Sequence, residues 1–292
     1  SVLRPRSLHR SSGLSFGATS VGGALSATSG NGAITQIGAL TVTGASALNA
    51  GTGDITLNNA TNNFVGAVSS SGANLSLTDG TGGLVLGATS ATGTLSVTST
   101  GGAITQVTPY TSSNAITTGG VASFTATSGA NAADIALANP DNSFGGTVAL
   151  SGKDVLIVDK TALALGVVTA TGNLNATSTG GLNFGATSVG GALSATSGNG
   201  AITQTGALTV TGTSDDMVRL TGEWVQGATA NGYTVYITKA SQGPSIYTPQ
   251  DDAGLVWLAN YLAGSLVANN VTDALYWISS QNNMFVANRD YP

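Results

Sequence analysis

The candidates for acid–base catalysis in the first 214 residues are aspartates. Enzymes that cleave polysaccharides place two carboxyl groups on one face, often beside a cationic side chain. Asp154 and Asp159, together with Lys153 and Lys160, form the only local cluster of charges. We interpret this cluster as a solvated loop. The six aspartates of this part of the chain are Asp54, Asp79, Asp134, Asp141, Asp154 and Asp159.

Other kinds of catalytic site are poorly represented. The chain has no cysteine, so disulfides, thiolate catalysis and cysteine-based zinc or iron–sulfur sites are excluded. The single histidine, His9, lies near the N-terminus, so no Ser/His pair is possible further along. Asp54 and Asp134 occupy equivalent positions of matching segments, which favours a role in turns. We therefore predict no catalytic residue, no cofactor and no metal site, and we expect the protein not to be an enzyme.

Small polar side chains suggest two further kinds of site. Glycine–aspartate turns are typical of calcium-binding β-rolls, but the nonapeptide G-G-x-G-x-D is absent. Threonines at alternate positions put two hydroxyl groups on one side of a strand, and a regular grid of them binds ice or glycan. Here the pairs are irregularly spaced along the chain, and threonine also suits exposed strand positions in general. The pairs are Thr41/Thr43, Thr125/Thr127, Thr169/Thr171 and Thr209/Thr211.

Aromatic residues are concentrated at the C-terminal end. Ten of the sixteen aromatic residues, including all three tryptophans, lie in residues 215–292. Tryptophan and tyrosine are enriched at interaction hot spots, so this segment is the predicted partner-binding region. A head-to-tail contact that does not close would produce a filament. The predicted contact residues are Trp224, Tyr233, Tyr236, Tyr247, Trp257, Tyr261, Tyr276 and Trp277.

Composition narrows the class of protein. Only 7% of the 292 residues are charged, and the formal net charge is −5. No run approaches the roughly 20 apolar residues that a membrane-spanning helix needs. The repeats contain no basic patch, so nucleic acid is a poor candidate partner. The regularly spaced aliphatic residues argue against disorder.

Internal repeats dominate the first two thirds of the chain. Phe16 to Gly44 recurs as Phe184 to Gly212 with 28 of 29 positions identical, differing only at Ile37 and Thr205. A longer period of 80 residues relates segments such as those that contain Asp54 and Asp134. Shorter steps of about 19–20 residues underlie both periods. Repetition at such a step is typical of solenoids.

Each step has the pattern of short strands and corners. Runs such as Leu75-Ser-Leu77 and Leu95-Ser-Val97 alternate apolar and polar residues, which predicts half-buried strands. Glycine-rich dipeptides between the runs predict tight corners. We therefore predict an all-β fold, a β-solenoid with about 20 residues per coil. About ten coils stacked at ~4.8 Å would form a rod of roughly 50 Å.

Three runs resemble a known family. GALTVTGASALNAGTGDITLNNATNNFVGAV (38–68), GANLSLTDGTGGLVLGATSATGTLSVTSTGGAITQ (72–106) and GNGAITQTGALTVTG (198–212) resemble repeats of filamentous-haemagglutinin-like proteins, the exoproteins of bacterial two-partner secretion. The resemblance covers residues 14–214. It implies a right-handed parallel β-helix, export across a Gram-negative outer membrane, and adhesion, aggregation or biofilm formation. It carries over no catalytic residue.

Three regions follow from these patterns. Residues 1–13 are predicted to be a flexible tail, 14–214 the β-helix array, and 215–292 a small aromatic-rich α+β cap or interaction domain. In the last region Tyr233–Ile237 predicts a hairpin strand after Asn231-Gly232, and Thr248-Pro249 predicts a helix start.

The function expected from sequence is structural and adhesive. We expect a secreted or cell-surface adhesin or filament subunit that self-associates through its C-terminal segment, with a surface glycan or host ligand as a further partner. The alternatives are a polysaccharide-active β-helix enzyme and a glycan- or ice-binding module.

Overall fold

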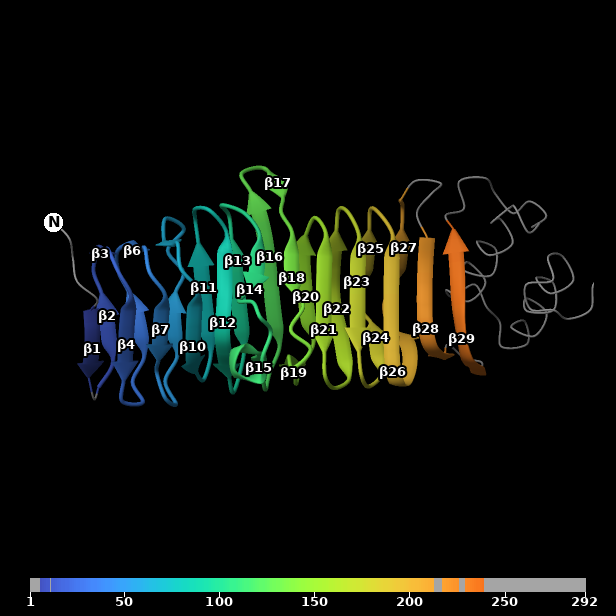
Figure 1. The fold of residues 1–292 in the computed structure, drawn as a ribbon, viewed down its shortest axis with the longest axis horizontal. Coiled ribbons are helices and arrows are strands. Elements are labelled where there is room, and N and C mark those ends of the chain that lie inside the picture. The colour runs from blue at the N-terminus through green and yellow to red at the C-terminus, as the bar shows by residue number, and fades with distance from the viewer. Residues whose placement is uncertain (1–5, 11, 213–216, 226–228, 239–292) are drawn as a thin grey trace, which may run out of the picture.

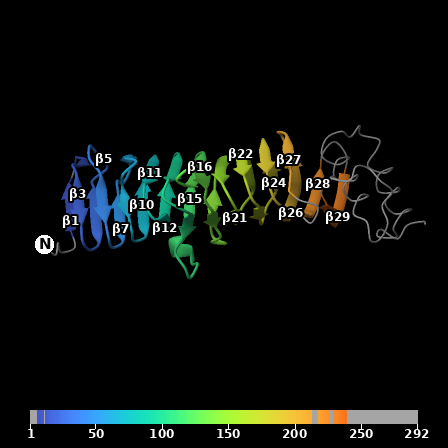
Figure 2. The same ribbon diagram turned by 90° about the horizontal axis from the view of Figure 1, so that it is seen from above.

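The computed structural model describes residues 6–10, 12–212, 217–225 and 229–238, with side chains for residues 7–9 and 12–212. The described residues form a rod of stacked strands, and two views at right angles show the same elongated shape (Figures 1 and 2). The rod is nearly all β, with about 10 turns of roughly 20 residues each. This confirms the predicted β-solenoid.

One stack of parallel strands runs along the first side of the rod. Each strand pairs in register with its counterpart in the next coil, so the backbone hydrogen bonds run along the rod axis. After β12 the stack divides, because β12 pairs with two shorter strands that follow one another in the chain. The strands are β1 (Arg6–Arg10), β4 (Leu25–Ser29), β7 (Ser46–Asn49), β10 (Val68–Gly72) and β12 (Leu84–Ala91), then β14 (Ile104–Gln106), β18 (Ile135–Leu137), β21 (Val155–Asp159), β23 (Leu174–Ser178), β26 (Leu193–Gln204) and β28 (Met217–Val225), with β15 (Ile116–Thr118) and β19 (Ser143–Phe144) as the branch.

A second stack runs beside the first and divides in the same way. Here β22 pairs with the two shorter strands β24 and β25. The strands are β2 (Leu14–Phe16), β5 (Ile34–Gln36), β8 (Ile55–Leu57), β11 (Leu75–Asp79), β13 (Leu95–Ser99), β16 (Ala122–Ser128), β20 (Val148–Gly152) and β22 (Leu163–Ala170), then β24 (Leu182–Phe184), β25 (Thr187–Val189) and β27 (Leu208–Val210).

Few strands lie outside these two stacks. β3 (Thr19–Val21), β6 (Leu40–Val42) and β9 (Asn63–Phe64) form a separate three-stranded sheet. β17 (Asn131–Ala132) pairs antiparallel with the end of β16, and this hairpin stands above the neighbouring coils in Figure 1. One short 3-10 helix, η1 (Ser112–Asn114), is the only helix of the described residues.

The alternating sequence pattern decides which side chains enter the rod. In β11, for example, Leu75, Leu77 and Asp79 are buried while the residues between them are half-buried. Inward residues of successive coils are register partners, as for Ile55, Leu75 and Leu95. The buried residues therefore make one continuous core along the rod. Since no single coil covers its own apolar face, stability comes from the contacts between neighbouring coils.

The two ends of the array differ from the sequence expectation in detail. Residues 6–10, within the predicted tail, form β1 and pair with β4, so the rod includes strands before residue 14. β28 extends the first stack, and β29 (Thr229–Thr238) pairs antiparallel with it. Asn231-Gly232 lies inside β29 and not at the turn before it. The helix predicted after Thr248 and the rest of the predicted α+β region lie outside the described residues.

Candidate functional site

The predicted contact residues lie at the C-terminal end of the rod or beyond the described part of the chain. Trp224 is on β28, where it is the register partner of Ile202 in β26. Tyr233 and Tyr236 are on β29, opposite Gly222 and Arg219. Tyr247, Trp257, Tyr261, Tyr276 and Trp277 lie outside the described residues. The binding role predicted for these eight residues stays a prediction.

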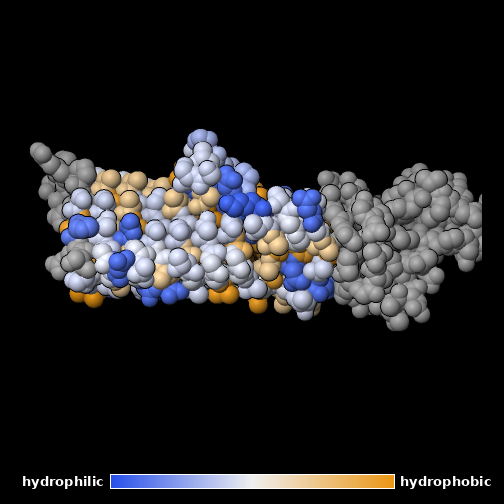
Figure 3. Space-filling model, turned by 90° about the horizontal axis from the view of Figure 1, so that it is seen from below, coloured by the Kyte–Doolittle hydropathy of each residue, from blue (hydrophilic) through white to orange (hydrophobic). Residues whose placement is uncertain are grey.

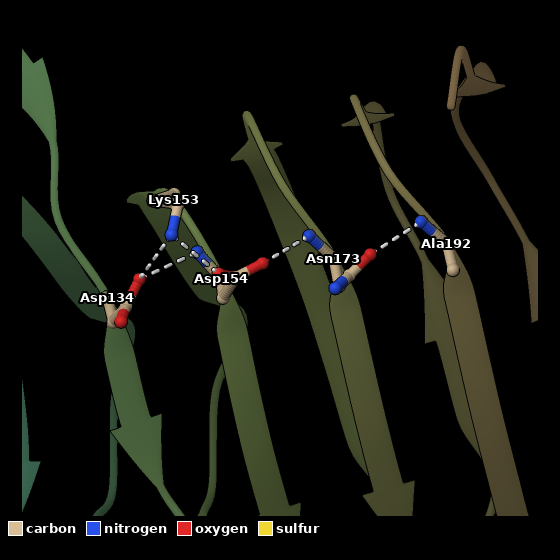
Figure 4. Close-up of polar contacts among 5 residues, drawn as sticks. All are labelled: Asp134, Lys153, Asp154, Asn173 and Ala192. Atoms are coloured by element: carbon tan, nitrogen blue, oxygen red, sulfur yellow. Dashed lines mark hydrogen bonds and ion pairs between the residues drawn. The ribbon is translucent and has the colours of Figure 1, made fainter. Parts of the chain in front are cut away.

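Two members of the predicted charge cluster, Lys153 and Asp154, lie at a ladder of corner residues (Figure 4). The Asp154 amide donates to Asp134 Oδ1 at 3.2 Å, and the Asn173 amide donates to Asp154 Oδ1 at 2.8 Å. The Ala192 amide continues the ladder by donating to Asn173 Oδ1 at 2.8 Å. Each side-chain oxygen thus accepts from the backbone of the next coil and fixes the corner where a strand begins.

Lys153 forms ion pairs with both carboxylates of this ladder and offsets one of their two negative charges. Its Nζ lies 3.1 Å from Asp154 Oδ2 and 4.0 Å from Asp134 Oδ1, with all three side chains substantially exposed. The hydrogen bond from the Asn173 amide, followed by that from Lys153, lowers the pKa of Asp154. Exposed ion pairs stabilise little. The main consequence of the lysine is that two carboxylates can be stacked on successive coils without unscreened repulsion.

Asp159 is inside the rod, so the interpretation of Asp154 and Asp159 as one solvated loop is wrong for Asp159. Its side chain is 0% exposed, and it accepts from the Thr161 amide at 2.8 Å and the Phe144 amide at 3.2 Å. Asp79 is equally buried and accepts from the Phe64 amide at 2.8 Å. Both aspartates lie at inward positions of the alternating pattern of their strands. This alternation is the sequence signal that could have predicted their burial.

Two amide pairs accompany these carboxyls. Asn62, Gln106 and Asn142 are buried, and Gln36 is half-buried. Asn62 Nδ2 donates to Gln36 Oε1 at 2.9 Å, and Gln36 Nε2 donates to Asn62 Oδ1 at 2.8 Å. Gln106 and Asn142 form the same reciprocal pair, at 3.0 and 2.9 Å. The asparagine oxygens also accept from the backbone, Asn62 from Leu40 and Asn142 from the residue at position 116. Each pair thus joins neighbouring coils through a fully hydrogen-bonded interior contact.

A nine-residue connection, 107–115, breaks the regularity of the rod. It joins β14 to β15 and contains η1. Buried Asn139 holds it in place, since its Nδ2 donates to Thr111 O at 2.9 Å and to Asn114 Oδ1 at 2.7 Å. Beside this connection, the outer face of the first stack is hollowed into a groove of about 500 Å³, lined by small residues from β4, β7, β10, β12, η1 and β15.

Some threonines of the predicted pairs are aligned along the rod. Thr125, Thr169 and Thr209 belong to one file of register partners on the second stack, with Ser151 and Ser188 between them. Thr41 lies apart from them on β6. One threonine from each of three pairs is therefore aligned in space despite the irregular spacing along the sequence, because coils of unequal length still stack one on another.

The part of the chain that the structure describes contains no group of three or more His, Asp or Glu side chains placed to hold a metal ion. Nor does any helix of that part have the length and apolarity needed to cross a membrane.

The repeat pattern matches a known family model. Repeats of unknown function (DUF5649) match residues 6–71, 72–151, 152–183 and 177–218. These segments together cover 6–218, well over half of the chain. The chain belongs to the DUF5649 repeat family. No curated protein and no solved structure matches it.

The buried polar groups recur with the period of the DUF5649 repeats. One matched segment, 72–151, is 80 residues long, which equals the offset between Asn62 and Asn142 and between Asp79 and Asp159. The amide pair and the buried carboxyl therefore recur once per long repeat. The asparagine oxygen and the aspartate oxygen play the same structural role in each repeat. Each accepts a hydrogen bond from a backbone amide of another coil.

The two interior carboxyls of the DUF5649 repeats predict a dependence of stability on pH. Burial raises the pKa of Asp79 and of Asp159, and the hydrogen bonds that they accept offset only part of this effect. A carboxyl whose pKa is higher in the folded state contributes stability below its unfolded pKa and loses that contribution as the pH rises through the folded value. We therefore expect the urea midpoint of the protein to fall as the pH rises above the ordinary aspartate pKa of about 4.

The matched control removes the titration and keeps the shape. The double variant Asp79→Asn/Asp159→Asn should lack this part of the pH dependence. The urea midpoints of the native protein and the variant should therefore approach each other as the pH falls. An equal pH dependence in both proteins would show that the buried carboxyls do not titrate as inferred.

Proposed function

We propose that this protein is a structural and adhesive rod, secreted or held at the cell surface, of the filamentous-haemagglutinin-like kind. The observation that carries the proposal is the continuous stack of about 10 coils with one shared core. Such an array spaces its two ends at a fixed distance, because each coil is fixed to the next by registered backbone pairs. The sequence runs described above support the resemblance to exported adhesins.

The outer surface of the described residues is consistent with a stable rod in a variable medium. In Figure 3 pale residues of intermediate hydropathy predominate on the face shown, with blue and orange residues scattered among them. Threonine, serine and glycine are enriched in such corners and strands, and only 7% of the chain is charged. The stability of a rod with few surface charges depends little on ionic strength, because there are few charge interactions for salt to screen. This property suits a protein exposed outside the cell.

Electron microscopy of the purified full chain tests the rod and its assembly together. We expect straight rods, and end-to-end filaments if the aromatic C-terminal segment joins subunits. The triple variant Trp224→Ser/Trp257→Ser/Trp277→Ser should then give single rods with an unchanged circular dichroism spectrum. Globular particles would overturn the rod, and filaments that persist in the variant would overturn the assembly role of these tryptophans.

Adhesion and location need separate measurements. Antibody labelling of intact producing cells should detect the protein at the surface or in the medium, and beads coated with the full chain should attach to cells more than uncoated beads do. Detection only after cell lysis would overturn the proposed location. Incubation with acidic polysaccharides should leave their chain length unchanged, and shortening that is lost in Asp154→Ala would favour the enzymatic alternative.

A further inference from the structure

The 107–115 connection beside the groove is longer than closure of a coil requires. The corresponding connections are three residues between β5 and β6 and two residues between β24 and β25. Nine residues are therefore not required to close a coil. Ordering the additional residues costs conformational entropy, and ordered irregular connections of this kind are commonly functional.

Side-chain hydrogen bonds make this connection a fixed wall. Besides the contacts from Asn139, Asn114 Nδ2 donates to Pro109 O at 2.9 Å and the Thr111 amide donates to Asn114 Oδ1 at 3.0 Å. Asn139 is 0% exposed, so the wall is anchored to the interior of the next coil. Ser112 and Ser113 project from it along the groove, and Tyr110 is 39% exposed on the same connection.

The floor of the groove is a regular row of small polar side chains. Thr28, Asn49, Ser71, Ser90 and Thr117 are consecutive register partners across five strands, and all line the groove. The row rises by one coil, about 4.8 Å, at each step. A second hollow of about 310 Å³ shares lining residues with the first and lengthens it toward the N-terminal end of the rod.

The chemistry of the lining selects one class of ligand. Hydroxyl groups and a side-chain amide both donate and accept hydrogen bonds, and no charged residue lines the groove. A ligand that repeats its own hydroxyl groups along an extended chain can pair with this row, whereas an ionised ligand would lose hydration without gaining a counter-charge.

We propose that this groove binds a neutral glycan chain, laid along the rod axis over β4, β7, β10 and β12 and against the 107–115 wall. The inference rests on the proposed adhesive function and assigns its ligand class and its site. Ser90 and Thr117 on the floor and Ser112 on the wall supply the hydrogen bonds.

The chain contains its own matched control. Ser151, Thr169 and Ser188 repeat the positions of Ser71, Ser90 and Thr117 on the second stack, as consecutive register partners in the later repeat. There the short connection between β24 and β25 provides no wall. Ser90→Glu and Thr169→Glu therefore place the same longer, charged side chain on equivalent exposed strand positions, one inside the groove and one outside it.

The test uses the full chain and defined saccharides. Saturation-transfer NMR and calorimetry would be run with neutral hexasaccharides of β-1,4-linked glucose, xylose, mannose and N-acetylglucosamine, with heparin and polygalacturonate as charged comparators. We expect at least one neutral hexasaccharide to bind, and Ser90→Glu to weaken this binding by about tenfold or more, while Thr169→Glu binds like the native protein.

The outcomes separate this inference from the proposed function. Binding to charged polymers alone, equal losses in Ser90→Glu and Thr169→Glu, or no binding to any neutral hexasaccharide would overturn the glycan site. Intact rods in electron microscopy with any of these results would leave the adhesive rod standing and remove only the groove as its glycan site. Adhesion of coated beads that is unaffected by Ser90→Glu would point to a protein ligand elsewhere.

Discussion

Replacing Asn142 by alanine should destabilise the rod by about 3–5 kcal/mol, which is the largest effect that we expect from a single polar substitution. Asn142 is 0% exposed and forms both hydrogen bonds of the pair with Gln106. It also accepts from the Ile116 amide at 2.9 Å and donates to Leu137 O at 3.2 Å. Alanine removes all four of these hydrogen bonds from a buried site, although Gln106 Oε1 keeps the bond from the Asn139 amide. Urea denaturation followed by circular dichroism measures the loss.

Two comparisons distinguish an unsatisfied interior from a general sensitivity of asparagines. Asn173→Ala removes an exposed corner asparagine that accepts one hydrogen bond from Ala192, so its effect should be below about 1 kcal/mol. Gln106→Leu/Asn142→Leu removes both amides together and should destabilise less than the sum of the two single leucine variants. Additive effects in that cycle would contradict the reciprocal pair.

Alanine at position 66 should reduce the free energy of unfolding by on the order of 3 kcal/mol, because the coils approach too closely there for any side chain. A Cβ at Gly66 would lie 2.4 Å from the carbonyl carbon of Gly44 and 2.5 Å from its oxygen. Gly44 in turn lies against Gly23, with its Cβ position 2.6 Å from the Gly23 carbonyl carbon. These contacts are with backbone, so relief requires two coils to separate.

Gly17→Ala is the matched control for that substitution. No atom lies within 4 Å of a Cβ at Gly17, and its backbone is not left-handed. Its replacement should be neutral or stabilising by up to about 1 kcal/mol, since alanine restricts the unfolded chain. Thermal melts of both variants would check the difference, and a Gly66→Ala melt that coincides with that of Gly17→Ala would refute the close stacking of these corners.

Much of the interior of the rod was predictable from the alternation of residues. The parity of Leu75, Leu77 and Asp79 places all three inside, and the burial of these residues agrees. The Asp79-Gly80 dipeptide also resembles a turn, so composition alone favoured an exposed aspartate. The parity rule was the better guide, because one residue of slip would turn every aliphatic side chain of the strand toward water.

The polar contacts between coils needed the tertiary structure. Gln36 pairs with an asparagine 26 residues away, whereas Gln106 pairs with one 36 residues away. The longer separation reflects the connection at 107–115 and the hairpin formed by β16 and β17. Coils of unequal length still stack in register, so sequence distance does not state which corner groups meet. The groove has the same origin, since its floor comes from five coils and its wall from one insertion.

The sequence by itself determined the period of the coil, the inward residues and the positions of most strands, because alternation and glycine corners are local signals. Only the tertiary structure decided the conformation of the repeated segment around Asn31 and Asn199. In the first copy Asn31 has φ 67° at a corner between β4 and β5, and its side chain accepts from the Thr52 amide at 3.1 Å. In the second copy the same residues belong to one strand, β26, which pairs with β28 with a register shift between Thr196 and Ala201. With 28 of 29 residues shared, the difference arises from what stacks on the segment: another coil with its own corner in one case, and a long strand in the other.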